Sequence, residues 1–396
     1  MPAAYNPSAQ YDVKIWDEEF RKTPTRTLLA RIYQPQGPGP FPTLLDLHGG
    51  AWNDKDRLAE PRMDEALARS GILVVAVDMR LAPETPYPGS VQDGNYAVRW
   101  LKHNAPKWKG DPSGIGIFGS STGGYVAELV AMRPRDPRYT AIPLPEAPNL
   151  DASISYVIGR SPISDPVARF QNAESKKREG MMQKTKNYFV PWESIQEGNP
   201  QQILDRGEKV TLPPILIMQG ALDDNVIPPI QRKFVESYRK AGGECHLEVF
   251  EGCDHMWVHD PGPQTDRAQE LAKAFIAKHL RALAKAAEAA LAKGFGPRRP
   301  GTEGHQWFPS VTSFPSACRM ASPTRRWRRE GRLVWSARSR GRSGERRRVL
   351  GRNGIDVSVA AASLRRALPA GRHAGHPGAA HRGAVARSPR HAGRRR

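Results

Sequence analysis

Short apolar runs alternate with amphipathic segments along the first three quarters of the chain. Strands are predicted at 11–16, 27–33, 43–47, 72–78, 115–118, 215–219 and 246–250, and helices at 57–70, 91–102, 122–132, 229–241 and 263–293. The run from Ile72 to Asp78 is almost continuously apolar, as in a central parallel strand that is buried on both faces. Strands that alternate with helices predict right-handed βαβ units, and therefore a mostly parallel sheet.

Composition changes abruptly near residue 294. Residues 294–396 contain 24 arginines, no lysine and four acidic residues, so this segment alone accounts for the chain's net charge of +20. Residues 1–293 are neutral and long enough for one hydrophobic core. We therefore predict one folded domain at 1–293, followed by a low-complexity basic tail at 294–396 whose composition cannot bury a core and favours disorder.

Two interpretations of the tail remain open. Abundant arginine, alanine, glycine and proline without any lysine is typical of a GC-rich gene translated out of frame, so the tail is interpreted first as a frameshifted extension. The alternative is an authentic basic segment, which would bind nucleic acid non-specifically by neutralising phosphates. The tail lacks a recognisable nucleic-acid-binding module, so no other nucleic-acid binding is expected.

A glycine-rich turn follows one of the predicted strands. Residues 119–123 read Gly-Ser-Ser-Thr-Gly, a Gly-x-Ser-x-Gly pattern between a strand and a helix, which is the setting of a nucleophile elbow. Positions two residues from the serine must be small, because the strand and the helix approach closely there. Ser121 has Gly119 and Gly123 at these positions, whereas Ser120 lacks such small neighbours. Ser121 is the predicted nucleophile, and a glycine-lined turn without chemistry is the alternative.

A second glycine-rich turn comes one strand earlier in the sequence. The apolar strand 43–47 ends in His48-Gly49-Gly50. Cleavage of an ester or amide places negative charge on the carbonyl oxygen, and backbone N–H groups held in advance can receive that charge. The N–H of Thr122, directly after the predicted nucleophile, is expected to complete this oxyanion hole.

Two later loops supply the partners that a serine nucleophile needs. Asp223 and Asp224 follow the apolar strand 215–219, and His255 follows the strand 246–250. A serine hydroxyl becomes a good nucleophile when a histidine takes its proton, and a carboxylate fixes the tautomer of that histidine. The order Ser121, Asp223, His255 along the chain, each after a strand, predicts a catalytic triad. Asp224 is expected to be solvated.

The chain resembles α/β-hydrolases of the carboxylesterase and hormone-sensitive-lipase-like branch over about residues 10–285. The resemblance rests on these stretches: His48-Gly49-Gly50-Ala51-Trp52, Asp78-Met79-Arg80-Leu81-Ala82-Pro83-Glu84, the Ser121 elbow, and the loops of Asp223 and His255. It implies an α/β-hydrolase fold with an eight-stranded, mostly parallel sheet between helices, no cofactor, and hydrolysis of short acyl esters. It also implies that the N–H groups of Gly50, Ala51 and Thr122 form the oxyanion hole.

The chain departs from this branch at two positions. Ala51 stands where the branch often has a third glycine, and Met79 stands where it often has tyrosine. The backbone N–H survives a change from glycine to alanine, so the oxyanion hole is expected to be retained. The His-Gly-Gly-x-Trp form also resembles arylformamidases, so an amide or formanilide substrate is kept as an alternative.

The alternation of strands and helices stops between residues 161 and 207, where enzymes of this type carry a cap over the site. The predicted cap contains Met181, Met182, Tyr188, Phe189 and Trp192. These side chains either contact an apolar substrate group or pack the insertion onto the core. Trp52 and Trp257, beside the oxyanion turn and the predicted catalytic histidine, are expected to line the substrate pocket.

Several features define the expected setting of the protein. The three cysteines provide no disulfide framework, and the N-terminus and the remaining sequence contain no signal-like or membrane-spanning apolar run. We therefore expect a cytoplasmic protein without membrane contact. No cluster of cysteine and histidine has metal-ligand spacing, so no metal is expected.

The sequence as a whole predicts a serine carboxylesterase that acts on small-molecule esters with small to medium acyl chains through an acyl-enzyme intermediate. The first alternative is an amidase or arylformamidase that uses the same triad. The alternative from another class is a non-catalytic binding protein with the hydrolase fold, or a nucleic-acid binder that acts through the arginine-rich tail.

Overall fold

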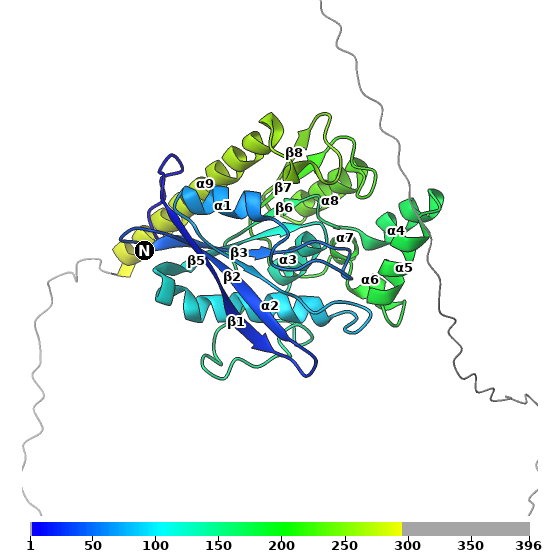
Figure 1. Ribbon diagram of the computed structural model, residues 1–396, viewed down its shortest axis with the longest axis horizontal. Helices are drawn as coiled ribbons and strands as arrows, with labels where there is room; N and C mark the ends of the chain where they lie inside the picture. Colours follow the sequence, from blue (N-terminus) through cyan, green and yellow to red (C-terminus); the bar gives the residue numbers. More distant parts are fainter. Residues whose placement is uncertain (1, 295–396) are drawn as a thin grey trace, which may run out of the picture. The chain divides into compact units, whose positions relative to one another are not determined.

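The predicted eight-stranded, mostly parallel sheet is confirmed in the computed structural model, which describes residues 2–294 (Figure 1). The strands are β1 (Val13–Lys22), β2 (Thr27–Pro35), β3 (Phe41–Leu47), β4 (Leu73–Val77), β5 (Gly110–Ser120), β6 (Tyr156–Arg160), β7 (Ile215–Gly220) and β8 (Cys245–Phe250). Their order across the sheet is β1-β2-β4-β3-β5-β6-β7-β8. β2 pairs antiparallel with β1 and with β4, and all other neighbouring strands are parallel.

The apolar runs of the central strands supply two hydrophobic cores, one on each face of the sheet. Val74 and Phe118 point to one core, and Val75 and Ile117 point to the other, because successive side chains of a strand alternate between faces. All four side chains are fully buried. This double burial explains why strands such as β4 appear in the sequence as continuous apolar runs.

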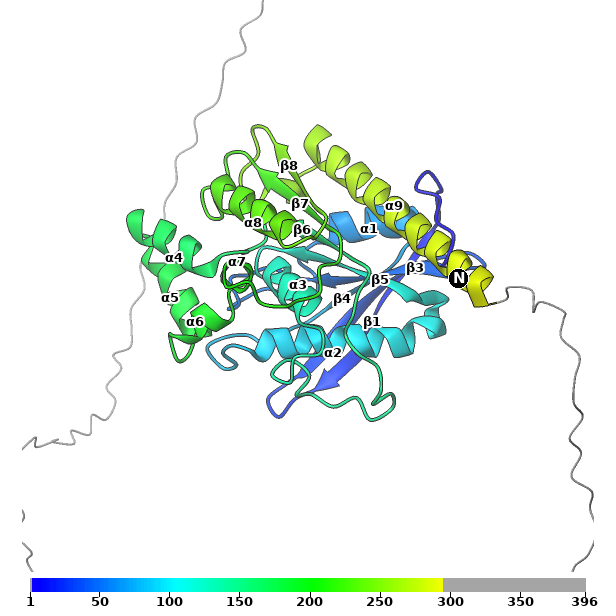
Figure 2. The ribbon, with the colours of Figure 1, turned by 180° about the vertical axis from the view of Figure 1, so that it is seen from behind.

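Helices cover both faces of the sheet. Residues of α1 (Pro61–Arg69) and α9 (Pro263–Gly294) pack into one core, and residues of α2 (Gly89–Asn104), α3 (Thr122–Met132) and α8 (Pro228–Lys240) pack into the other. Figure 1 shows α1 and α9 on the side of the sheet opposite to α2, and Figure 2 shows the same layers from behind. The described residues therefore form a three-layer α/β structure.

The segment predicted to be a cap consists of four short helices between β6 and β7. They are α4 (Pro166–Ser175), α5 (Glu179–Tyr188), α6 (Ser194–Glu197) and α7 (Pro200–Asp205). In both ribbon views α4, α5 and α6 stand at one end of the domain formed by the described residues, beyond the edge of its main layers (Figures 1 and 2). Tyr188 and Phe189 at the end of α5 are buried in the main core.

Several element boundaries differ from the sequence predictions, and two of the differences are large. The first strand extends to Lys22, well beyond the predicted residue 16, because its second half pairs with β2. The helix predicted at 57–70 begins only at Pro61, a residue whose fixed φ suits the first turn of a helix. The predicted basic tail at 294–396 lies outside the described residues, apart from Gly294 at the end of α9.

Candidate active site

The predicted nucleophile elbow is a strained turn between β5 and α3. Ser121 has φ 53° and ψ −110°, a combination that is costly for any residue with a side chain. Ser121 also occupies the N-cap position of α3, but its hydroxyl does not cap the helix. Its Oγ is therefore left for another partner.

Close backbone contacts enforce the glycines on both sides of Ser121. A Cβ on Gly123 would lie 1.7 Å from the carbonyl oxygen of Leu47, and a Cβ on Gly119 would lie 2.7 Å from the backbone of Gly123. Neither position tolerates a side chain, as the sequence pattern predicts. Ser120, by contrast, points away from the pocket: its side chain is fully buried and its Oγ accepts a hydrogen bond from Arg160.

The structure brings Ser121, His255 and Asp223 together, although they come from three separate loops. His255 Nε2 lies 3.2 Å from Ser121 Oγ, and His255 Nδ1 lies 2.7 Å from Asp223 Oδ2. The Nδ1–H group donates to the carboxylate, which leaves Nε2 to accept the serine proton. Each of the three residues follows the carboxyl end of a parallel strand, so the sheet places them at one edge.

Asp223 is held as an anion by several donors. Its Oδ1 accepts from the backbone N–H groups of Asn225 and Val226 at 3.0 and 2.9 Å, and its Oδ2 also accepts from Gln219 Nε2 at 3.0 Å. Burial alone would raise the pKa of Asp223, but the hydrogen bond and charge of His255 and the backbone donor outweigh it, so the pKa is lowered. The ionised carboxylate of Asp223 fixes both the ring orientation and the tautomer of His255.

The three backbone N–H groups predicted to form the oxyanion hole are free of hydrogen bonds within the described residues. They belong to Gly50, Ala51 and Thr122. Gly50 has φ +110°, and a Cβ there would lie 1.9 Å from the carbonyl oxygen of Asp54, so only glycine fits. Ala51 also has a positive φ of 53°. Thr122 is the first residue of α3, where the helix dipole favours negative charge.

His48 holds the oxyanion turn in place. Its Nδ1–H donates to the carbonyl oxygen of Gly49 at 2.7 Å, and its Nε2 accepts from the backbone N–H of Met79 at 3.2 Å. Burial lowers the pKa of His48, so the ring is neutral at neutral pH and can accept the Met79 N–H. The bond to Met79 uses the backbone, so it does not depend on the side chain at that position.

Sequence reasoning did not identify an ion pair that lies beneath the histidine loop. Arg160 at the end of β6 is almost fully buried and donates to the carbonyl oxygen of His255 at 2.5 Å and to Glu60 Oε1 at 3.0 Å. Arg160 therefore ties the His255 loop to β6 and to the start of α1. The sequence feature that could have indicated this ion pair is an arginine at the end of an apolar strand.

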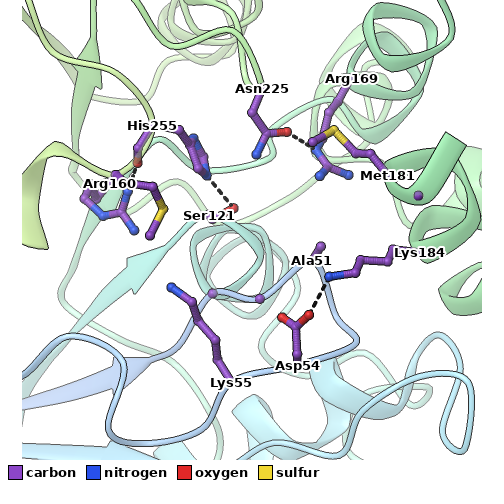
Figure 3. A pocket seen from close by; sticks show the side chains of 14 residues that line it. Ala51, Asp54, Lys55, Ser121, Arg160, Arg169, Met181, Lys184, Asn225 and His255 are labelled. Atoms are coloured by element: carbon purple, nitrogen blue, oxygen red, sulfur yellow. Dashed lines mark hydrogen bonds and ion pairs between the residues drawn. The ribbon is translucent and has the colours of Figure 1, made fainter. Parts of the chain in front are cut away.

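A cavity of about 420 Å³ opens above Ser121 (Figure 3). It is lined by the predicted residues Gly50, Ala51, Ser121 and His255, and by Gly49, Asp54, Lys55, Arg160, Arg169, Gly180, Met181, Lys184, Asn225 and Met256. Met181 is the member of the predicted cap set that lines the cavity. Arg169, Asn225 and Met256 were not singled out from the sequence.

The structure corrects the predictions for Trp52 and Trp257, neither of which lines the cavity. Trp52 is 3% exposed and stacks on Tyr188, with ring centroids 4.7 Å apart. Trp257 is 8% exposed and stacks on Phe250 in the core beneath α9, with ring centroids 4.4 Å apart. Although Trp52 and Trp257 are close in sequence to the oxyanion turn and to His255, both indole rings point into the core, where their apolar surface is buried.

Other sequence expectations concern metals, membranes and cysteines. Within residues 2–294, no group of three or more histidine, cysteine, aspartate or glutamate side chains has a metal-binding arrangement. In the same part of the chain, no helix has the length and apolar character needed to cross a membrane. Cys245 and Cys253 are both buried and free. The cytoplasmic location stays a prediction.

The sheet, the elbow and the order of the polar residues along the chain define the class of α/β-hydrolases. Residues 31–237, more than half of the chain, match the family model BD-FAE. The chain therefore belongs to the BD-FAE family, within the carboxylesterase-like α/β-hydrolases, which confirms the resemblance seen in the sequence.

Relatives of known sequence carry hydrolase and esterase names. The AB hydrolase superfamily protein C1039.03 of Schizosaccharomyces pombe is 29% identical over 241 residues, which cover 57% of this chain and 67% of that protein. Esterase LipC of Mycobacterium tuberculosis is 30% identical over a stretch that covers 50% of this chain and 49% of LipC. Carboxylesterase NlhH of the same species is 39% identical over a stretch that covers 24% of this chain and 30% of NlhH. The chain thus spans half or less of these two mycobacterial relatives.

Solved structures share the fold at low sequence identity. A truncated carbohydrate esterase from gut microbiota is 17% identical with a TM-score of 0.56, and the matched region covers 70% of this chain and 99% of the esterase. Thermogutta terrifontis esterase 2, phosphoramylated by tabun, is 22% identical with a TM-score of 0.54, and the matched region covers 67% of this chain and 94% of that esterase. These similarities confirm the α/β-hydrolase fold.

Proposed function

We propose that the chain is a serine carboxylic ester hydrolase that acts through an acyl-enzyme intermediate, with Ser121, His255 and Asp223 as its catalytic triad. The observation that carries the proposal is the continuous hydrogen-bonded chain from Ser121 Oγ through His255 to Asp223, at the base of a cavity. The esterase names of the relatives support the same reaction class.

In the first half of the proposed reaction, Ser121 Oγ attacks the ester carbonyl carbon while His255 Nε2 takes the hydroxyl proton. The carbonyl oxygen becomes an oxyanion, which accepts hydrogen bonds from the N–H groups of Gly50, Ala51 and Thr122. Collapse of the tetrahedral intermediate breaks the bond to the alcohol oxygen, which receives the proton from His255. The acyl group is then bonded to Ser121, and the alcohol leaves.

The second half of the proposed reaction repeats these steps with water. His255 Nε2 takes a proton from a water molecule whose oxygen attacks the acyl carbon, and the same three N–H groups hold the new oxyanion. His255 then returns the proton to Ser121 Oγ, and the carboxylic acid is released. Asp223 stays ionised throughout and stabilises the imidazolium form of His255.

The size of the cavity supports small to medium acyl chains. A volume of about 420 Å³ lies toward the lower end of the range of about 300–1,000 Å³ that is usual for small-molecule pockets. Met181 and Met256 supply flexible apolar surface at its wall. We expect turnover of esters to fall once the acyl chain outgrows this volume.

The test is hydrolysis of a series of p-nitrophenyl esters of increasing acyl length by the full chain and by Ser121→Ala. We expect the variant to lose most of the activity, since removal of a catalytic serine in a protease of another fold costs on the order of 10⁶ in turnover. Equal activity in the two proteins would refute the role of Ser121 and favour the non-catalytic interpretation.

The amidase and arylformamidase alternative uses the same residues and is separated by substrate. Rates on an aryl ester are compared with rates on the matched anilide and formanilide. Faster cleavage of the ester supports the proposal, and faster cleavage of the C–N bond supports the alternative.

Salt-sensitive DNA binding that disappears when residues 295–396 are deleted would support the nucleic-acid interpretation of the tail.

A further inference from the structure

Arg169 on α4 places a buried positive charge at the wall of the cavity. The side chain is 1% exposed and is one of the residues that line the cavity above Ser121. Its Nε donates to Asn225 Oδ1 at 2.9 Å, and its Nη1 donates to Thr185 Oγ1 at 3.2 Å. Both acceptors are neutral, and no carboxylate in residues 2–294 forms an ion pair with Arg169.

The guanidinium is fixed in place by its surroundings. Its Cζ lies over the ring of Trp52, 5.7 Å from the ring centroid. Trp52 therefore supports the cavity from behind, through Arg169. Two of the five guanidinium N–H groups are used by Asn225 and Thr185, and the others have no acceptor among the described residues.

Arg169 stays charged despite its burial. Desolvation lowers its pKa to about 10, and the charge of Asp223 opposes this fall. The group is therefore cationic at neutral pH. No hydrogen bond joins Asp223 to Arg169, and the Asp223 oxygens accept from His255, Gln219 and backbone N–H groups.

The other charges of the cavity leave an excess of positive charge. Lys184 pairs with Asp54, and Arg160 pairs with Glu60. Lys55 is exposed and has no hydrogen bond or ion pair within residues 2–294. Figure 3 shows Lys55 and Arg169 on opposite sides of Ser121. Among the described residues, Lys55 and Arg169 are thus two cations of the cavity that form no salt bridge.

A buried, desolvated cation is costly unless an anion compensates it. A guanidinium with free N–H groups in a fixed plane suits a carboxylate, which accepts two parallel hydrogen bonds. We propose that the ester substrate carries a carboxylate in addition to the ester group, and that Arg169 binds it while Ser121 attacks the ester carbonyl. This inference rests on the proposed function and makes Arg169 a residue that determines specificity.

The carboxylate could belong to the acyl part or to the alcohol part of the ester, and two substrate pairs separate these sources. For the acyl part, monoethyl succinate is compared with ethyl levulinate, a neutral analogue of similar shape. For the alcohol part, 4-acetoxybenzoate is compared with 4-acetoxyacetophenone. We expect the full chain to have a higher kcat/KM for the anionic member of one pair.

Arg169→Met is the variant that tests the inference. A hydrogen-bonded charge pair in a desolvated site corresponds to about 10- to 100-fold in binding. We therefore expect kcat/KM for the preferred anionic ester to fall by about this factor, chiefly through KM, with little change for the neutral partner. Arg169→Lys should restore part of the preference, since it keeps the charge but loses the planar fork.

Arg178→Met is the matched control, because Arg178 comes from the same insertion, pairs with Asp224 at the surface and does not line the cavity. It should leave the anionic preference unchanged. Equal losses on the anionic and neutral esters in Arg169→Met would overturn the inference, since they would mean that Arg169 only positions the Asp223 loop. Absence of an anionic preference in the full chain would also overturn it.

A measurement on the unchanged protein covers the case in which the Arg169 variants do not fold. Competitive inhibition of neutral ester hydrolysis is measured for two pairs of compounds. Succinate is compared with the uncharged succinamide, and 4-hydroxybenzoate is compared with the uncharged 4-hydroxyacetophenone. Stronger inhibition by a carboxylate supports the inference, and equal inhibition contradicts it. Ser121-dependent hydrolysis of the neutral esters with no such preference would leave the proposed function intact while this inference fails.

Discussion

Asp223 and Asp224 are neighbouring carboxylates in different environments. Asp223 is 2% exposed, bonded to His255 and surrounded by donors, whereas Asp224 is exposed and pairs with Arg178 at the surface. The strand–loop pattern placed both residues after β7, and the sequence predicted Asp223 as the triad member and a solvated Asp224. Only the packing of the loop, in which Asp223 accepts the backbone N–H groups of Asn225 and Val226, turns one carboxylate toward His255.

This difference gives a prediction with an internal control. Asp223→Asn should lower kcat on a p-nitrophenyl ester by about 10⁴-fold, because an amide in place of the carboxylate favours the wrong tautomer of His255. Asp224→Asn changes the charge by the same amount one residue away and should keep nearly full activity. Steady-state kinetics of the two variants make the comparison. A similar loss in both, or in neither, would contradict the assignment of Asp223.

At the scale of elements, the strand ends organise the site. The loops that carry the site follow four parallel strands, β3, β5, β7 and β8, and therefore meet at one edge of the sheet. This brings together the His48 turn, the Ser121 elbow and the loops of Asp223 and His255. Apolar runs and glycine spacing predicted this arrangement from the sequence. The insertion was less predictable, because its helices are held by contacts distant in sequence, such as the stacking of Tyr188 on Trp52.

Helix α3 contains a buried carboxyl group that the proposed chemistry does not use. Glu128 is fully buried, and Ser164 donates a hydrogen bond to its Oε1 at 2.8 Å. Desolvation raises the pKa of Glu128 from 4.5 to about 8, against the opposing effect of Ser164. Between these two values the folded protein binds more protons than the unfolded chain, so the free energy of unfolding falls as the pH rises.

Glu128→Gln should remove this contribution. Relative to the unchanged protein, the variant should gain stability between pH 5 and pH 8, by more than about 1.4 kcal/mol, the free energy of one pKa unit. Urea unfolding at the two pH values measures the difference. Glu236→Gln, at an exposed position of α8, should show no such gain. An equal effect of Glu128→Gln at both pH values would contradict the raised pKa.

At the scale of the whole molecule, charge and chemistry occupy different parts of the chain. The net charge of +20 comes from residues 294–396, whereas every residue that lines the cavity lies between Gly49 and Met256. We therefore expect a chain that ends at Gly294 to keep the kcat/KM of the full chain on a neutral ester. Its retention on heparin should fall strongly, because the cationic segment is gone. Loss of esterase activity in the shortened chain, with its fold intact, would contradict this separation.

The sequence predicted the parts of the site that depend on local backbone geometry. The elbow glycines, the His48 turn and the strand-end positions of Asp223 and His255 all follow from rules about neighbouring residues. It did not predict that Arg160 and Arg169 line the cavity or that Trp52 does not, because these side chains take their positions from packing across the insertion and the sheet. Pocket walls of this kind depend on tertiary contacts that no local pattern encodes.

The central claim is that Ser121 is the nucleophile, and covalent labelling tests it most directly. The full chain is treated with diethyl p-nitrophenyl phosphate, which transfers its diethylphosphoryl group to an activated serine and releases p-nitrophenol. We predict one label per chain, located by peptide mass analysis at Ser121, with loss of esterase activity in step with labelling and no label in Ser121→Ala. A label at another residue, or full activity after complete labelling of Ser121, would contradict the account.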